Sequence, residues 1–249
     1  MLRRSAGTRG EREAILQRGY PGYDTSVGWF NYDDDRVRDN VKKALGDGFR
    51  AMKLKVGSPD SDRDIRRAFM IRDLVGADCD VMLDVNQQWT LPRAIRNSIR
   101  LSDMNPYWIE EPTHPDDVLA HQTLARAIAP VRIATGEHLP HRVSFKNFLQ
   151  AGAMQFCQVD CVRVGGVSEF LAISLMAKKF GVPVMPHVGD MGQIHQHLVL
   201  FNHIAVEHPA IFLEYIPHLR QHFKHPARVA DGIYQTPQEP GSSSDLLEA

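Results

Sequence analysis

Ionisable side chains recur along this chain at nearly constant spacing, each near the end of a short β-rich run. They are Lys53, Lys55, Asp84, Glu110, Glu137, Asp160, His187 and Glu214. From Lys55 onward the spacings are 29, 26, 27, 23, 27 and 27 residues. Neighbouring unpaired carboxylates repel one another, so a group gathered from such positions needs a cation. The chemistry that these residues predict is removal of a proton next to a substrate carboxylate, with a metal and Lys53 stabilising the enediolate that forms.

Asp84, Glu110 and Glu137 are the predicted metal ligands, because they come from three successive β-rich runs. Oxygen ligands without Cys or His suit a hard cation, and Mg2+ is the first choice. A different interpretation treats Glu110 and Glu111 as a solvated pair at a strand end and Asp84 as the cap of the next helix. The recurrence of the pattern favours the metal site.

Lys53 and Lys55 alternate within one predicted strand, so both side chains point to the same face. That face is predicted to be the interior of the fold, with Met52, Leu54 and Val56 packing outward against helices. Two interior lysines beside carboxylates would bind an anionic substrate, and one of them would act as a base if its pKa were depressed. The alternative is a pair of surface lysines on an edge strand.

His187 and Asp160 end two neighbouring β-rich runs, and a carboxylate beside an imidazole fixes its tautomer and raises its basicity. We therefore predict that His187 is a general base oriented by Asp160, with Lys55 and His187 flanking the substrate carbon on opposite faces. Glu214 would donate a hydrogen bond to the enediolate or buttress the site, and His138 borders the site. Five further histidines are predicted to be structural: His195, His197, His218, His222 and His225.

The elements that position these residues are short β-rich runs alternating with stretches of helical length. The β-rich runs cover residues 25–30, 50–57, 81–86, 107–112, 132–138, 155–160, 183–189 and 212–217, and the helical stretches include 33–48 and 167–181. Such alternation predicts parallel strands joined by right-handed crossovers. Eight units predict a (β/α)8 TIM-type barrel, in which all strand ends surround one mouth. An open doubly wound sheet is the alternative, but no G-x-G-x-x-G or Walker-type loop follows any strand.

The composition is that of a soluble globular protein: the 249 residues are 43% hydrophobic and 24% charged, with a net charge of −1. We expect no nucleic-acid partner, because the charge is balanced, and no membrane span, because no apolar run approaches about 18 residues. Three cysteines without a C-x-x-C pair favour a reducing, cytoplasmic location. The predicted organisation is a polar N-terminal connector (1–24), a catalytic barrel (25–235) and a flexible Pro/Gly/Ser-rich tail (236–249).

Seven motifs in fixed order resemble the mandelate racemase branch of the enolase superfamily: KLKVG, MLDVNQQW, WIEEPTHPDD, IATGEH, QVD, MPHVG and FLEY. Three further stretches are most similar to L-fuconate dehydratases: GYPGYDTS, the segment from IATGEHLPHRVSFKNFLQ to MQFCQVD, and LMAKKF. The resemblance begins near Arg12 and implies the modified (β/α)7β barrel of this superfamily. Its known chemistry, a Lys or His base with one or two Mg2+ ions, agrees with the chemistry inferred from the residues.

By matching motif, the resemblance assigns roles to the residues already named and adds Asn86, which would approach the 2-hydroxyl of the substrate. The roles are Mg2+ ligation for Asp84, Glu110 and Glu137, substrate binding and catalysis for Lys53, Lys55 and Glu214, and the principal base, oriented by Asp160, for His187. In the dehydratases the same histidine returns the proton to the departing 3-hydroxyl, which gives a 2-keto-3-deoxy acid. The implied function is a Mg2+-dependent hydro-lyase acting on a small-molecule sugar acid, L-fuconate or a related aldonate.

Two features depart from the family pattern. Family members begin with an α+β capping domain, which residues 1–24 could not form, so we expect the chain to be the barrel part of a longer protein. In PHVGDMGQIHQH the loop after His187 is shorter than the PHAGGVGLCE-type segment of typical L-fuconate dehydratases, so a related six-carbon or five-carbon acid is an alternative substrate. Oligomers are common in the family, which makes a homo-oligomer an expectation.

Three other functions are compatible with the sequence. A racemase or epimerase of the same branch would use Lys55 and His187 as opposed bases. A Schiff-base aldolase would use Lys53 or Lys55 without a metal, although the three carboxylates favour metal chemistry. A barrel without a capping domain could also be an inactive fragment or a partner subunit.

Overall fold

The computed structural model describes residues 6–188, 191–209, 211–241 and 243–248. Its strands are β1 (Tyr20–Gly28), β2 (Ala51–Lys55), β3 (Asp80–Asp84), β4 (Ile109–Glu110), β5 (Ile133–Thr135), β6 (Phe156–Cys157), β7 (Leu213–Tyr215), β8 (Val229–Ala230) and β9 (Ile233–Tyr234). The longer helices are α3 (Asp34–Gly46), α4 (Ser61–Val75), α5 (Leu91–Leu101), α6 (Val118–Ala127), α7 (Arg142–Ala151), α8 (Val167–Lys179) and α9 (Ile194–Phe201). Short helical segments are η1 (Ala6–Thr8), α1 (Arg9–Glu13), α2 (Ile15–Arg18), η2 (Ser102–Met104), η3 (Asn202–Val206) and η4 (Pro217–His222). No helix among the described residues has the length and apolar character needed to cross a membrane.

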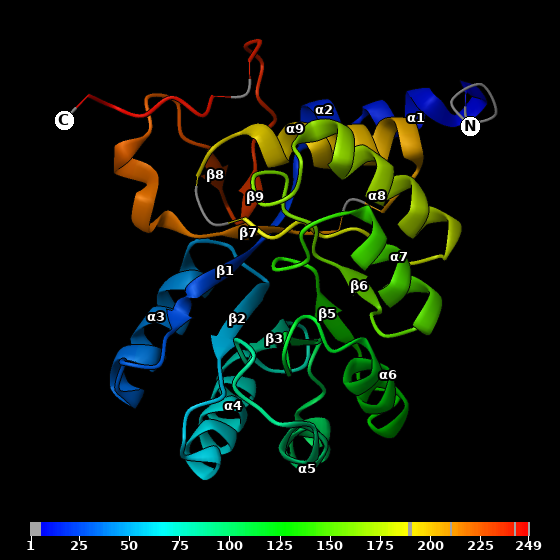
Figure 1. Cartoon of the computed structure of the whole chain (residues 1–249). Helices are drawn as coiled ribbons and strands as arrows, with labels where there is room; N and C mark the ends of the chain where they lie inside the picture. The colour runs from blue at the N-terminus through cyan, green and yellow to red at the C-terminus, as the bar shows by residue number, and fades with distance from the viewer. Residues whose placement is uncertain (1–5, 189–190, 210, 242, 249) are drawn as a thin grey trace.

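Parallel pairing joins the strands in the order β7–β1–β2–β3–β4–β5–β6, so each strand from β1 to β6 lies beside the next one in the chain. Seven of the eight predicted β-rich runs are confirmed as strands. The eighth, 183–189, contributes a parallel bridge from Val184 to Cys157 on the far side of β6, and its last residue lies outside the described residues. With α3 to α8 on the outside (Figure 1), this is the predicted α/β barrel arrangement.

The N-terminal segment differs from the predicted polar connector. β1 begins at Tyr20 rather than at residue 25, and α1 and α2 precede it. Ile15 is buried in a hydrophobic cluster that includes Tyr20 and Val199, and the Arg12 Nε donates a hydrogen bond to the Ile204 carbonyl oxygen (2.9 Å). Ile15 is the buried residue of the short helices that precede β1. Because most of the other residues in these helices are polar, the sequence predicts a connector there.

The C-terminal part contains a hairpin, β8–β9, that the sequence analysis did not predict. Its turn residues Asp231 and Gly232 have φ of 53° and 69°, the left-handed conformation that a tight hairpin turn requires. β9 pairs antiparallel with the start of β1. Within the predicted tail, backbone hydrogen bonds join residues 245–247 to residues 222–224. The start of β1 is therefore covered by chain that lies some 200 residues later.

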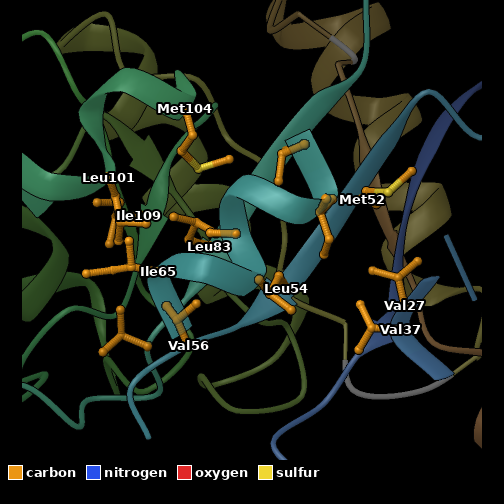
Figure 2. Close-up of a cluster of buried hydrophobic side chains, with 14 of the residues drawn as sticks. Val27, Val37, Met52, Leu54, Val56, Ile65, Leu83, Leu101, Met104 and Ile109 are labelled. Carbon is orange, nitrogen blue, oxygen red and sulfur yellow. The ribbon is translucent and has the colours of Figure 1, made fainter. Parts of the chain in front are cut away.

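A hydrophobic layer lies between the strands and the outer helices. Figure 2 shows Met52, Leu54 and Val56, from β2 and the residue after it, near Val37 of α3 and Ile65 of α4. Both helices begin at an aspartate N-cap whose side chain accepts the backbone N–H three residues on. Because side chains alternate along a strand, the outward packing of these residues turns the two lysines of β2 inward, as predicted.

The interior of the barrel is divided into an apolar floor and a charged upper layer. Tyr23, Met82, Trp108, Phe156 and Met185 are all buried in one cluster, with the Trp108 ring edge-on to that of Tyr23 (centroids 5.5 Å apart). At five positions an ionisable residue follows a floor residue by two, on the same face of the strand direction. The pairs are Ala51–Lys53, Met82–Asp84, Trp108–Glu110, Met185–His187 and Phe212–Glu214. The same alternation that builds the floor therefore places the charges above it.

Gly48 tests the contact between the end of α3 and the β8–β9 hairpin. It has φ of +87°, and a Cβ there would lie 2.4 Å from the carbonyl carbon of Asp231. We expect Gly48→Ala to lower the free energy of unfolding by more than about 1 kcal/mol, because backbone atoms must move and the left-handed conformation is strained. Gly46→Ala is the matched control, since nothing lies within 4 Å of its added Cβ. Urea denaturation followed by circular dichroism measures both, and equal midpoints would contradict the prediction.

Candidate active site

The predicted site residues meet at one end of the barrel, above the apolar floor. Asp84 and Glu110 are the last residues of β3 and β4, and Glu137 and Asp160 lie two and three residues beyond β5 and β6. The side chains of the cluster are buried, apart from Lys55, whose side chain is 15% exposed. The members that come together are Lys53, Lys55, Asp84, Glu110, Glu137, Asp160, His187 and Glu214. All eight predicted residues thus share one site.

Lys53 lies at the centre of this cluster. Its Nζ is 2.5 Å from Glu110 Oε1, 2.7 Å from Glu214 Oε1 and 3.4 Å from Asp84 Oδ2. Burial by itself would lower the pKa of Lys53, but these carboxylates, with the Tyr23 hydroxyl, raise it well above the usual value. Lys53 is therefore a fixed positive charge and not a neutral amine, which argues against a role as base or as Schiff-base nucleophile.

Lys55 and the backbone hold Asp84 as an ionised carboxylate. The Lys55 Nζ lies 2.5 Å from Asp84 Oδ2, and the Asn86 backbone N–H donates to Asp84 Oδ1 (3.0 Å). Burial would raise the pKa of Asp84, but Lys53 and Lys55 outweigh it and lower the pKa to about 2. The backbone of Asn86 thus supports a predicted metal ligand, while contact of its side chain with a substrate hydroxyl stays a prediction.

His187 and Asp160 form the predicted imidazole–carboxylate pair. The His187 Nδ1 lies 2.7 Å from Asp160 Oδ2, which leaves Nε2 directed toward Glu137 Oε2 (3.1 Å) and Glu214 Oε2 (3.8 Å). Burial would lower the pKa of His187, but the hydrogen bond to Asp160 and the charges of Glu214 and Glu137 raise it to about 9. An ionised Asp160 that accepts from Nδ1 leaves Nε2 as the atom that exchanges protons with a ligand.

The cluster contains more buried carboxyl groups than its cationic side chains neutralise. The six carboxyl groups are those of Asp84, Glu110, Glu111, Glu137, Asp160 and Glu214, and the four cations are Lys53, Lys55, Arg163 and His187 with its raised pKa. One consequence is that burial, reinforced by Asp84 and Glu214, raises the pKa of Glu110 to about 8 despite the opposing effect of Lys53. Glu110 Oε2 accepts a hydrogen bond from Trp108 Nε1 (2.9 Å), so the floor orients this carboxyl group. An oxygen-rich, buried and electron-rich cluster of this kind fits a hard divalent cation.

A second group of residues lies at the mouth, and of these only His138 was placed at the site from the sequence. The ring Nδ1 of His138 donates to Glu111 Oε1 (2.6 Å), and Gln87 Nε2 donates to Glu111 Oε2 (3.0 Å). Arg163 Nη1 contacts Glu137 Oε1 (3.3 Å) and the Nε2 of His138 (3.2 Å). Glu111 is buried, so it is not a solvated partner of Glu110, and His138 borders the site as expected. The sequence indicates both positions, because Glu111 directly follows Glu110 in IEEP and His138 directly follows Glu137 in GEH.

The two groups offer different metal-ligand sets that share Glu137. Among the described residues, the ligand atoms of Glu111, Glu137 and His138 all lie within 4.8 Å of one another. The predicted ligands Asp84 and Glu110 instead contact the ammonium groups of Lys53 and Lys55. The assignment of Mg2+ to Asp84, Glu110 and Glu137 therefore stays a prediction.

Two sequence-based assignments concern residues that lie near His187 in space or in the chain. His195, predicted to be structural, contacts Asp160 from α9 (Nε2 to Oδ1, 3.0 Å) and so belongs to the site. The local sequence does not indicate this contact, because it depends on which face of α9 packs against the barrel. The loop after His187, predicted to be short, includes residues 189 and 190, which lie outside the described residues.

The fold and the cluster together define a barrel of the class in which carboxylates and a histidine at the strand ends surround one mouth. The chain belongs to the enolase C-terminal domain-like family, whose model matches residues 36–249. It is 42% identical over 248 residues to mitochondrial enolase superfamily member 1 of Homo sapiens, covering 97% of this chain and 56% of the relative. It is 41% identical over 254 residues to L-galactonate dehydratase of Hypocrea jecorina, covering 99% and 56%. The chain thus spans about half the length of these curated relatives.

Solved structures agree with this assignment. The crystal structure of human mitochondrial enolase superfamily member 1 superposes with a TM-score of 0.92 at 42% identity, over 99% of this chain and 57% of that one. The L-talarate dehydratase of Polaromonas sp. JS666, solved with Mg and L-glucarate, gives 0.82 at 31% identity, over 93% and 62%. The predicted enolase-superfamily barrel is confirmed, and Mg is present in solved relatives; a specific closeness to L-fuconate dehydratases is not part of this match.

Two substitutions discriminate between the two ligand sets. If Asp84, Glu110 and Glu137 hold Mg2+, Glu110→Gln weakens binding by more than about tenfold, because a charged ligand is lost. His138→Gln then has the smaller effect. Isothermal titration calorimetry with Mg2+, or titration with Mn2+ followed by electron paramagnetic resonance, gives both affinities. Lost binding in the His138 variant with binding retained in the Glu110 variant would assign the metal to Glu111, Glu137 and His138.

Glu110 and His187 make the stability of the metal-free chain depend on pH. Their pKa values are raised to about 8 and about 9, so both groups keep protons in the folded chain that they release on unfolding. From about pH 6.5 to pH 8 the folded state binds more protons, so the free energy of unfolding falls as pH rises. Added Mg2+ reduces this fall, because it stabilises the deprotonated carboxyl groups. Urea denaturation midpoints at pH 6, 7 and 8, with Mg2+ and with EDTA, measure this fall in stability. A midpoint that rises with pH in EDTA would contradict the prediction.

Proposed function

We propose that this chain carries the catalytic barrel of a Mg2+-dependent sugar-acid dehydratase, a hydro-lyase that forms a 2-keto-3-deoxy acid. The observation that carries the proposal is the buried His187–Asp160 pair facing the ammonium group of Lys53 across a cluster of carboxylates. Two relatives support the reaction class by name: L-galactonate dehydratase of Hypocrea jecorina, and L-talarate/galactarate dehydratase of Salmonella typhimurium, 38% identical over 176 residues.

In this proposal, the residues of the chain divide the work of one proton transfer and one elimination. Asp84, Glu110 and Glu137 would hold Mg2+, which when bound supplies positive charge to the substrate carboxylate. Despite burial, carboxylates raise the pKa of His187 to about 9 in the metal-free chain, and the positive charge of Mg2+, when bound, would lower it and free Nε2. His187 then takes the proton from C2 through Nε2, and the electron pair moves into the carboxylate to form an enediolate. Lys53 stabilises that negative charge, because its ammonium group is already ionised and needs no reorganisation.

The second half of the reaction uses the same histidine. His187, now carrying the proton, delivers it to the 3-hydroxyl group as the C3–O bond breaks, and water leaves. The resulting enol tautomerises to the 2-keto-3-deoxy acid. Asp160 keeps Nδ1 protonated throughout, so Nε2 alone gains and loses the proton. Lys55 stands beside Asp84 at the more exposed edge, where it can meet the substrate anion.

For the substrate, we propose L-fuconate or a related aldonate. L-Fuconate is the 6-deoxy form of L-galactonate, so the two acids present the same C2 to C5 configuration to the reacting groups. The identity of 41% with L-galactonate dehydratase supports this class, and an arabinonate dehydratase of Saccharolobus solfataricus, 29% identical over 215 residues, supports five-carbon acids as alternatives. The partner in this proposal is a small-molecule acid.

A cytosolic location and a homo-oligomer stay predictions. The three cysteines, Cys79, Cys157 and Cys161, are buried and free, which suits a reducing compartment.

Proton NMR in D2O tests the function. The chain is incubated with Mg2+ and L-fuconate, L-galactonate, galactarate or arabinonate, and loss of the C2 proton and of the 3-hydroxyl is followed in one experiment. We expect a 2-keto-3-deoxy product, and we expect His187→Asn to slow its formation by roughly 10²- to 10⁴-fold, because the proton carrier is removed. His203→Gln, on η3 and away from the mouth, is the control.

The outcomes separate the competing functions. Exchange or epimerisation at C2 without loss of water would replace the dehydratase by a racemase that uses Lys55 and His187. No change with any acid, for a chain that binds Mg2+, would rule out the activity for the barrel by itself. A product that forms equally well in EDTA would contradict the metal requirement.

A further inference from the structure

His195 occupies an unusual position behind the imidazole–carboxylate pair. It is fully buried on α9, and its Nε2 lies 3.0 Å from Asp160 Oδ1 and 3.1 Å from the backbone nitrogen of Cys161. Its Nδ1 is buried and has no hydrogen-bond partner within the described chain. A buried ring nitrogen without a partner costs free energy, so the contacts of Nε2 must offset that cost.

Whether Nε2 of His195 carries the ring proton decides which of these two contacts is a hydrogen bond. If Nε2 carries a proton, it donates to Asp160 Oδ1; if it carries the lone pair, it accepts from the N–H of Cys161. Asp160 is surrounded by donors, because Oδ2 accepts from His187 and Oδ1 accepts from the Val162 N–H (2.9 Å), so it is a carboxylate. A lone pair on Nε2 would face that anion at 3.0 Å.

The balance favours a proton on Nε2. A hydrogen bond to a charged acceptor is roughly twice as strong as one between neutral groups, so donation to Asp160 outweighs acceptance from Cys161. In this form the N–H of Cys161, 3.1 Å from Nε2, loses its acceptor. In the other form the proton on Nδ1 has no partner and a lone pair on Nε2 faces the Asp160 anion. The charge-assisted bond to Asp160 therefore selects the Nε2–H form of His195.

We propose that His195 is a positioning residue for the proposed base, acting through a continuous His195–Asp160–His187 hydrogen-bond chain. This inference rests on the proposed function of His187 and deepens it. The Val162 N–H and His195 hold Oδ1 of Asp160, so the carboxylate cannot rotate about its Cβ–Cγ bond without breaking both bonds. Oδ2 therefore stays directed at Nδ1 of His187, and Nε2 of His187 stays directed at the mouth. His195 touches no reacting atom.

Three variants test the role in catalysis. His195→Leu removes the donor, His195→Gln keeps an N–H near the position of Nε2, and His197→Leu is the control on the same helix. We expect His195→Leu to lower kcat for dehydration by roughly 10- to 100-fold, the effect of losing a hydrogen bond to a charged group, with KM little changed. His195→Gln restores most of the rate, and His197→Leu leaves it unchanged. Equal rates for His195→Leu and the wild type would overturn the proposal.

A spectroscopic measurement keeps the test independent of turnover. In the wild-type chain labelled with 15N-histidine, long-range 1H–15N spectra identify which nitrogen of each ring carries the proton. We expect the Nε2–H form for His195, and we expect the Nδ1–H signal of His187 to shift in His195→Leu and to recover in His195→Gln. An Nδ1–H form for His195 would overturn the proposal without any variant, even if His195→Leu failed to fold. If the wild type turned over no acid, the proposed function would fail, while these spectra would still decide the role of His195 in orienting Asp160.

Discussion

The ammonium group of Lys53, enclosed by three carboxylates at the centre of the barrel, is the interaction on which the site depends. Glu110, Glu214 and Asp84 come from strands that are far apart in sequence, and each contacts the same nitrogen atom. Without that charge, three buried carboxylates would repel one another and would be desolvated with little compensation. The lysine therefore stabilises the strand ends, and in the proposed mechanism the same charge would also stabilise the reacting anion.

The alternation of side chains along the strands also fixes this arrangement, because it sets the charged residues above the apolar floor. On five segments the charged residue follows a floor residue by two positions, so a shift of register by one residue would exchange the barrel interior with the helix-facing layer. Trp108 links the two layers directly, since its ring belongs to the floor and its Nε1 donates to Glu110. The outward packing of Met52, Leu54 and Val56 against the helices thus fixes the inward direction of Lys53 and Lys55.

The sequence predicts the parts of this protein that depend on local periodicity. The β-rich runs, the inward direction of Lys53 and Lys55 and the meeting of eight ionisable residues all follow from alternation within strands and from the topology of parallel barrels. The contacts of Ile15 and His195 could not be predicted in this way, because they depend on how a helix or an N-terminal segment docks on residues far along the chain. The β8–β9 hairpin is predictable only in part. Asp231-Gly232 indicates a tight turn, but each flanking strand has two residues, which is too short for alternation to show.

The aromatic floor also determines from which side the charged cluster meets solvent. Tyr23, Trp108 and Phe156 pack together below the charged layer. Lys53 and Glu110 are buried, whereas the side chains of Arg163 and His138 are 39% and 40% exposed. Among these residues, exposure to solvent is therefore one-sided: it begins at Arg163 and His138, and the packed rings close the opposite side.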